Sequence, residues 1–145
     1  MAAFNLVQLA YVSSPRDGIT ATDVDEIVKS STRNNSEIGV TGLLIWRENQ
    51  FFQVLEGPEL AVDILLRHIR EDSRHSNLKV IFRKYITKRK FGSWSMGQAT
   101  PSAKTGSDLK TLEAVLTNPE SMTETEGDRI SGLIESFRRG LWDVR

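Results

Sequence analysis

The chain has 145 residues, 39% of them hydrophobic and 26% charged, a composition typical of a single globular domain that builds its own core. Lysine plus arginine equals aspartate plus glutamate at 19 each, so no basic field favours nucleic-acid binding, and no apolar run approaches the ~18 residues of a membrane span. With no cysteine, disulfides, iron–sulfur clusters and thiol chemistry are excluded, and two histidines give no basis for a metal site.

The first predicted element is a strand. A nearly continuous apolar run over residues 6–12 indicates a strand that is covered on both faces, and we expect it to end at Ser13-Ser14-Pro15. The residues before this run lack the charged region and the long apolar region of a signal peptide, so we expect a cytoplasmic protein.

A helix is predicted next. Thr22, followed three residues later by Asp25, resembles a capping box with aspartate in place of glutamate. Apolar residues from Val24 to Val28 keep a helical spacing, and the helix is expected to stop around Asn34–Asn35.

A hairpin and a second helix follow. Residues 39–46 and 51–56 read as two strands, and residues 47–50 between them as a hairpin loop. Pro58 suits the first position of the second helix, whose buried stripe runs over residues 61–69.

Two more strands complete the first hundred residues, at 78–86 and 94–99. The order of elements then predicts an α+β fold, a ferredoxin-like mixed sheet with two helices packed side by side on one face and a cleft between them. Turn residues at 100–107 indicate a flexible connection at the end of this core, so we expect one domain over 1–100 and a helical extension over 101–145.

The extension is predicted to contain two helices, over residues 109–116 and 130–141. Ile130, Leu133, Ile134, Phe137 and Leu141 form an apolar stripe that must bury against the sheet or another subunit. An uncovered patch of this size on a small monomer would be unusual, so we expect the protein to self-associate.

Five segments carry polar side chains within or beside apolar runs: Tyr11, Asn34–Asn35, Gln53, residues 72–75 and residues 94–96. An uncharged polar group is costly to bury unless something hydrogen-bonds to it. A bound polar aromatic ligand would satisfy the whole set.

Taken singly, most of these residues have a simpler interpretation. Tyr11 suits a core tyrosine with a satisfied hydroxyl, and Asn34–Asn35 could cap the C-terminus of the first helix. Arg74 suits a solvated helix end, and Trp94 and Met96 could simply fill a core. Only the combined pattern favours a ligand site.

Gln53 is the sharpest signal because it interrupts an apolar strand. Strand alternation places its side chain on the same face as Phe51 and Leu55, so its amide should be buried and needs partners.

These segments, in this order, resemble the signature segments of the BLUF family, blue-light sensors that use FAD, over about residues 4–99. The tail resembles short stand-alone members with two C-terminal helices and no fused effector domain. This resemblance implies that the two helices pack on the sheet face opposite the flavin and that the protein forms dimers or larger rings. The residues that carry the resemblance are Tyr11, Arg33-Asn34-Asn35, Ile38 to Leu44, Phe51 to Gly57, Asp72 to Ser76, and Phe91 to Met96.

The resemblance implies a non-covalently bound FAD whose isoalloxazine ring lies between the first two helices. Asn35, with Asn34 beside it, would bond the pyrimidine edge of the ring, and Ile27 and Ile69 would form its apolar walls. The ribityl and phosphate end would meet Asp72, Arg74, His75 and His68, the last at a position where several relatives carry arginine.

The resemblance also implies the photochemistry. Tyr11 would give an electron and a proton to the excited flavin, and recombination would leave Gln53 rotated or tautomerised, with a new hydrogen bond to the flavin C4 carbonyl. Trp94 and Met96 are two apart on the fifth strand. In the family either one can lie near the glutamine, here Gln53, and exchange between them is one route from the flavin to the far face of the sheet.

No nucleophile beside a histidine, supported carboxylate pair or phosphate-binding loop is present, so we expect no enzyme activity and a conformational output. The leading interpretation is a blue-light photoreceptor that signals to a partner protein, as a homo-oligomer and without nucleic-acid or membrane contacts. The alternative is a ferredoxin-like interaction module with a degenerate site that binds no flavin. A flavin-dependent oxidoreductase is disfavoured because no substrate-handling acid or base stands out.

Overall fold

The computed structural model describes residues 5–47, 49–92, 95–117 and 124–144, with the backbone alone for 124–129. In chain order the elements are β1 (Leu6–Pro15), α1 (Ala21–Ile38), β2 (Thr41–Arg47), β3 (Gln50–Pro58), α2 (Glu59–Glu71), β4 (His75–Ile86), β5 (Gly97–Pro101), α3 (Asp108–Thr117), α4 (Glu124–Arg138) and β6 (Trp142–Val144). None of the helices in these residues is long and apolar enough to cross a bilayer.

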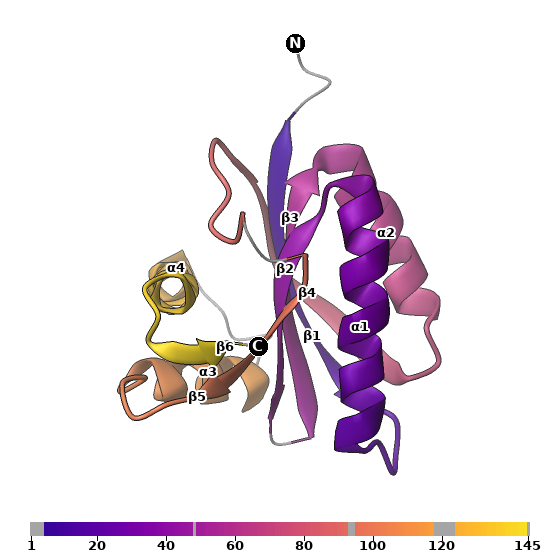
Figure 1. Cartoon of the computed structure of the whole chain (residues 1–145). Coiled ribbons are helices and arrows are strands. Elements are labelled where there is room, and N and C mark those ends of the chain that lie inside the picture. Colours follow the sequence, from indigo (N-terminus) through magenta and orange to yellow (C-terminus); the bar gives the residue numbers. More distant parts are fainter. Residues whose placement is uncertain (1–4, 48, 93–94, 118–123, 145) are drawn as a thin grey trace.

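One mixed sheet organises the chain, with strand order β4-β1-β3-β2-β5-β6. β2 and β5 run parallel, and the other neighbouring strands run antiparallel. α1 and α2 cover one face of the sheet, and α3 and α4 cover the other (Figure 1). The predicted α+β, ferredoxin-like arrangement is therefore confirmed, including the placement of the C-terminal helices on the opposite face.

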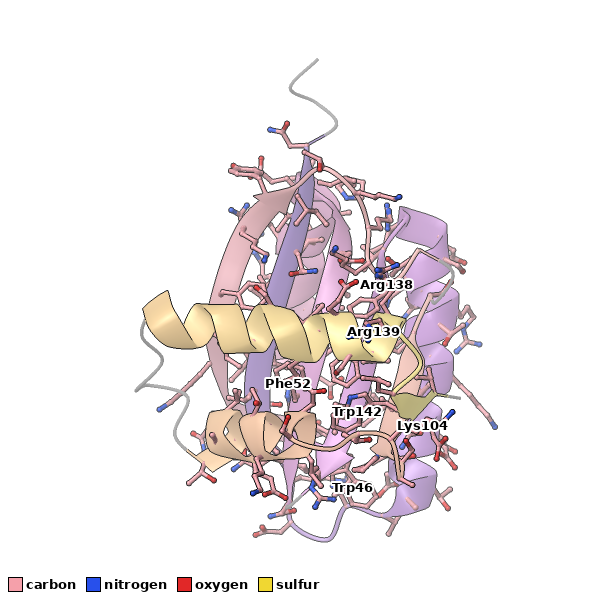
Figure 2. All side chains as sticks on the ribbon, turned by 90° about the vertical axis from the view of Figure 1, so that its left-hand side faces the viewer. Trp46, Phe52, Lys104, Arg138, Arg139 and Trp142 are labelled. Carbon is pink, nitrogen blue, oxygen red and sulfur yellow. The ribbon has the colours of Figure 1, made fainter. Side chains whose placement is uncertain are left out.

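Strand alternation divides the apolar side chains into two cores. Phe51 and Leu55 of β3 pack on the face of α1 and α2, whereas Phe52 and Val54 pack on the face of α3 and α4. From the latter side, α4 runs across the strands, and Phe52 lies between α3 and α4 in this view (Figure 2). The prediction that the first strand is covered on both faces is confirmed.

The start of α1 differs from the prediction. The N-cap is Thr20, whose side chain accepts a hydrogen bond from the Asp23 backbone, and the Asp23 carboxylate accepts from the Thr20 backbone at 3.0 Å. The capping box therefore lies two residues before the predicted Thr22 and Asp25. Both pairs have the same spacing, so local sequence could not distinguish them.

The end of α1 was also predicted too early. The helix continues to Ile38 and ends at Gly39, which adopts the left-handed conformation (φ 72°) and donates its backbone N–H to the Asn35 carbonyl. Asn34 and Asn35 therefore lie within the helix, and the interpretation that they cap it is wrong.

Tertiary pairing extends several strands. β1 continues to Pro15 because its end pairs with β3 and β4, and β4 accordingly begins at His75. Pro58 is the N-cap residue of α2 and not its first helical residue. The fifth strand spans Gly97–Pro101 and not 94–99, because its pairing with β2 begins at Gly97; Trp94 lies outside the described residues.

The stripe on the last helix is buried within the chain. Ile130, Leu133, Ile134 and Phe137 are at most 3% exposed and pack in the core beneath α3 and α4, and Leu141 lies just beyond the helix and packs against the same core. The stripe is thus covered without a second subunit. The argument that the sequence offered for self-association does not hold.

Residues 100–107 are not a flexible connection, as the turn residues there suggested. Both the Ser102 and Thr105 hydroxyls donate to the Leu141 carbonyl at 2.8 Å, and β6, a strand that the sequence did not predict, pairs with β5. Trp142 of β6 lies under the end of α4, where its indole donates to Ser136 at 2.9 Å (Figure 2). β5, β6 and the end of α4 are therefore tied together.

The two candidate caps of α1 give a direct test. Thr20→Ala removes the side-chain acceptor at the helix start and is expected to lower the free energy of unfolding by about 1 kcal/mol. Thr22→Ala, the matched control, should change it by less than about 0.5 kcal/mol because Thr22 is exposed within the first turn. Urea denaturation measures both variants, and an equal effect of the two would contradict the assigned cap.

Candidate functional site

A cavity of about 360 Å³ lies between α1 and α2, with the sheet as its floor. This volume lies within the range of small-molecule and cofactor pockets, roughly 300–1,000 Å³. Its lining consists of Tyr11, Ile27, Ser30, Ser31, Asn34, Asn35, Glu37, Ile38, Leu44, Phe51, Gln53, Leu55, Ile64, Leu65, His68, Ile69, Asp72, Arg74 and His75.

The floor of the cavity carries a chain of three buried side chains. Tyr11 of β1 and Gln53 of β3 are directly paired across the two strands, and the Tyr11 hydroxyl donates to Gln53 Oε1. Gln53 Nε2 in turn donates to the Met96 sulfur at 3.3 Å. All three residues are at most 6% exposed. The burial of Gln53 on the face of Phe51 and Leu55 confirms the prediction from strand alternation.

The chemistry of the two neighbours fixes the orientation of the Gln53 amide. A thioether sulfur has no hydrogen to donate, so only the amide nitrogen can bond to Met96. The amide oxygen then faces the tyrosine, whose hydroxyl can donate to it. In this arrangement both ends of the buried amide are satisfied.

Burial changes the pKa of the Tyr11 hydroxyl. Desolvation raises the pKa of its phenol well above the ordinary value, and the negative charge of Asp72 adds to the shift. The hydroxyl therefore stays protonated and remains a donor toward Gln53 throughout the neutral range.

Asn35 connects α1 to the segment that carries Met96. Its side chain is 1% exposed, and its amide nitrogen donates to the Ser95 carbonyl at 2.9 Å. One helical turn earlier, the Thr32 hydroxyl donates to the Met96 carbonyl at 3.4 Å. Asn34, its exposed neighbour, also lines the cavity. The last turns of α1 thus hold both the cavity wall and residues 95–96.

A polar cluster forms another part of the wall, where α2 ends. The Arg74 guanidinium binds the Asp72 carboxylate, with a shortest distance of 2.6 Å. These hydrogen bonds hold the pKa of Asp72 below its ordinary value and raise that of Arg74. The pair is partly exposed, so it orients the two side chains more than it stabilises the fold.

His75 is held from both sides beside this pair. Its Nε2 lies 2.5 Å from the Ile69 carbonyl, which can only accept, so this nitrogen carries a proton and donates. Its Nδ1 lies 2.7 Å from the Ser13 hydroxyl, and the ring centroid is 6.3 Å from that of Tyr11. His75 therefore has a fixed ring next to the tyrosine.

Apolar side chains form the remaining walls. Ile27 and Ile69 line the cavity as predicted, and Ile38 and Ile64 stand at 42% and 41% exposure. Aliphatic walls over a floor that carries an amide, with amides and a guanidinium in the lining, fit a flat ring system with one polar edge and a charged tail.

The structure places almost all of the predicted site residues around this one cavity. Tyr11, Ile27, Asn34, Asn35, Gln53, His68, Ile69, Asp72, Arg74 and His75 line it, and Met96 contacts Gln53. Trp94 lies outside the described residues.

Sequence reasoning missed part of the lining. Ser30, Ser31 and Ile38 of α1 follow Ile27 at helical spacing on the same face as Asn34, and this spacing was the available signal. Ile64 and Leu65 of α2 precede His68 and Ile69 by one turn. The polar serines and the expected early end of the helix concealed this face.

Comparison with known proteins decides the family. The sequence model of the family described as BLUF, sensors of blue-light using FAD, matches residues 6–97, more than half of the chain. This chain belongs to the BLUF family. The family is described as one of blue-light sensors that use FAD.

Individual relatives show how far the likeness of this BLUF chain extends. It is 37% identical over 91 residues to the blue light- and temperature-regulated antirepressor BluF of Escherichia coli strain K12, covering 63% of this chain and 23% of that protein. It is 31% identical over 96 residues to the photoactivated adenylate cyclase subunit beta of Euglena longa, covering 66% of this chain and 11% of that protein. The chain thus spans less than a quarter of the length of either relative.

A solved structure extends the likeness to the C-terminal helices. The dark-state structure of the BLUF protein BlrB has a TM-score of 0.75 and 29% sequence identity, covering 96% of this chain and 99% of that one. The likeness to this structure therefore includes the tail after residue 100.

The contrast between the two neighbouring asparagines can be tested directly. Asn35→Ala leaves the Ser95 carbonyl without its donor in a buried site, so we expect the flavin-free protein to lose about 1–3 kcal/mol of stability. Asn34→Ala, the matched control, should change stability by less than about 0.5 kcal/mol because this side chain is exposed. Chemical denaturation measures both variants. Equal stability of Asn35→Ala and the parent protein would contradict a structural role for the Ser95 contact.

Proposed function

We propose that this chain is a blue-light photoreceptor in which Tyr11, Gln53 and Met96 form the switch beside a non-covalently bound FAD. The observation that carries the proposal is the buried hydrogen-bonded chain from the Tyr11 hydroxyl through the Gln53 amide to the Met96 sulfur, at the floor of the cavity. FAD is the cofactor of the family to which the chain belongs.

The cavity residues fall into three groups, according to the part of FAD that they would contact. Ile27 and Ile69, on the facing helices, would hold the ring between apolar walls, and Asn34 and Asn35 would offer amides to its polar edge. Toward the ribityl and phosphate end, Arg74 supplies a guanidinium that Asp72 orients, and His68 and His75 belong to the same lining. An arginine side chain suits phosphate because its guanidinium can bind two oxygens at once.

When bound, the flavin supplies blue-light absorption and, in its excited state, an acceptor for one electron. Tyr11 would be the donor: its phenol can give up one electron together with its hydroxyl proton, which can leave along the hydrogen bond to Gln53. Both return to Tyr11, so no net oxidation of the protein remains. The raised pKa of Tyr11 keeps that proton in place until the electron leaves.

The change persists in the orientation of the Gln53 side chain. If its amide turns over, the oxygen faces the Met96 sulfur, and two groups without a hydrogen cannot bond to each other. The Met96 contact is then lost, while the amide nitrogen becomes free to donate elsewhere. Loss of one hydrogen bond is worth about 1 kcal/mol net, or roughly fivefold in an equilibrium, so the element that responds must already be close to balance.

β5 fits that requirement. It follows Met96 directly and pairs with β2 through two residue pairs only, Leu43 with Gly97 and Leu44 with Gln98. It is joined to β6 by three further pairs, and β6 is tied to the end of α4. We assign residues 1–100 to light sensing and residues 101–145 to output, toward a separate signalling protein. The antirepressor among the relatives supports such a partner.

Self-association is retained as part of this proposal on the resemblance to short family members alone. Sedimentation of the full chain in darkness and under blue light tests it. A monomer in both conditions would remove it without affecting the proposed photochemistry.

The two central side chains give the decisive test of the switch. Tyr11→Phe and Gln53→Leu should each keep flavin bound but abolish the light-induced shift of the flavin absorption band, because each breaks the hydrogen-bonded chain. Tyr85→Phe is the matched control, since it removes the hydroxyl of the only other tyrosine, at an exposed site bonded to Glu59.

Absorption spectra of the purified proteins, before and after blue light, provide the measurement. A normal shift in either switch variant would show that the photochemistry has been assigned to the wrong residues. A parent protein that stays colourless after incubation with FAD would favour the interaction module that binds no flavin.

A further inference from the structure

Glu56 is a fully buried carboxylate on the sheet face opposite the cavity. It is 0% exposed and lies three residues after Gln53 on β3, on the side of α3 and α4. It accepts hydrogen bonds from the Gln8 amide at 2.7 Å and from the backbone N–H groups of Lys90 and Phe91, both at 2.8 Å. These donors are neutral, so the buried carboxylate depends on all of them for its solvation.

The two backbone donors begin a segment that ends at the switch. Two described stretches, residues 90–92 and 95–96, are here together called the crossing segment. They start on the α3 and α4 face and end on the cavity face, because Phe91 packs in the former core and Met96 in the latter. Both of its ends are held by β3: Lys90 and Phe91 by Glu56, and Met96 by Gln53. One strand thus anchors the crossing segment at two points on opposite faces.

The two anchors differ greatly in strength. At the Met96 end, the side-chain contact is one weak hydrogen bond to sulfur, the bond that reorientation of Gln53 removes. At the other end, the contacts with Glu56 are charge-assisted and buried. Arg89 adds to them by donating to the Thr41 hydroxyl and to the carbonyls of Glu56 and Gly39.

The backbone of the crossing segment is held at residues 90–91 by Glu56 and at Ser95 by Asn35, whereas the hydrogen bond that holds the Met96 side chain is weak. When the Met96 contact is lost, the Glu56 end resists movement, so the change passes forward into β5, which is joined to β2 by only two residue pairs. We propose that Glu56 is a positioning residue of the photoswitch. Its carboxylate fixes residues 90–91, so that rearrangement at Gln53 moves β5, β6 and α4 and does not displace the crossing segment. This inference rests on the proposed light-sensing function.

The side chains of the anchored residues also reach α4 directly. The Phe91 ring lies 6.4 Å from that of Phe137, and the Lys90 ammonium lies 3.3 Å from the Glu135 carboxylate. Residues 90–91 therefore stay in place, and α4 can move relative to them.

Glu56→Gln tests the assignment in the full-length, flavin-loaded protein. The substituted amide keeps one oxygen but turns an N–H group toward backbone donors, so the anchor is weakened with little change in size. We expect flavin binding and the spectral shift to persist, and the Lys90 and Phe91 amides to exchange hydrogen about fivefold faster in darkness, as for the loss of about one net hydrogen bond.

The difference in hydrogen exchange between light and darkness is the decisive readout. In the parent protein, light should change exchange in residues 97–101 and 142–144. In Glu56→Gln this change should shrink, and a light-dependent change should appear in residues 88–92. A residue that only stabilised the fold would raise exchange generally without moving the light-dependent difference from one segment to another.

Two further variants keep the result interpretable. Glu135→Gln removes a carboxylate that contacts the Lys90 side chain but not the backbone, and it should leave the parent pattern in 88–92 and 97–101. Arg89→Met weakens the same anchor from the partly exposed side. It should shift the light-dependent exchange as Glu56→Gln does, and it replaces that variant if Glu56→Gln fails to fold.

The outcomes separate the two proposals. If a folded Glu56→Gln or Arg89→Met protein shows a normal spectral shift and the parent pattern of light-dependent exchange, the positioning role is overturned. If the parent protein shows no spectral shift, the light-sensing function itself fails, which is read from the spectrum before any exchange is measured.

Discussion

The buried Gln53 amide imposes the constraint on which the rest of the site depends. It has a tyrosine hydroxyl on one side and a thioether on the other, and only one orientation of the amide satisfies both. Because the Gln53 side chain is buried, an unsatisfied orientation is costly, and the amide has discrete states instead of a continuous range. A small chemical change next to the amide can therefore persist as a change in its hydrogen-bond partners.

The sheet separates that switch from the elements that respond. α1 and α2 enclose the cavity on one face, and α3 and α4 bury the other, so a rearrangement on the cavity face must cross the sheet to reach the C-terminal helices. Polar side chains mark the crossing on each side: Asn35 holds the Ser95 carbonyl, and Glu56 holds the backbone of Lys90 and Phe91. Loss of either side chain would leave its backbone partners without these hydrogen bonds.

Much of the fold and site follows from local pattern. Strand periodicity placed Gln53 on the face of Phe51 and Leu55, helical periodicity gave α1, α2 and α4, and their order gave the ferredoxin-like sheet. The apolar context made Tyr11, Asn35 and Gln53 stand out, because burying a polar group requires a partner. These inferences succeeded because each depends on residues close together in the sequence.

Other features depend on contacts between distant segments, and only the tertiary structure decided them. β6 is three residues long and exists because β5 offers it an edge, and the Leu141 carbonyl orders residues 100–107 through the Ser102 and Thr105 hydroxyls. The sequence does not show that Glu56 bonds to backbone 34 and 35 residues away, nor that Met96 is the group that Gln53 holds. Periodicity assigns a side chain to a face of the sheet, but its partner there is chosen by packing across the whole chain.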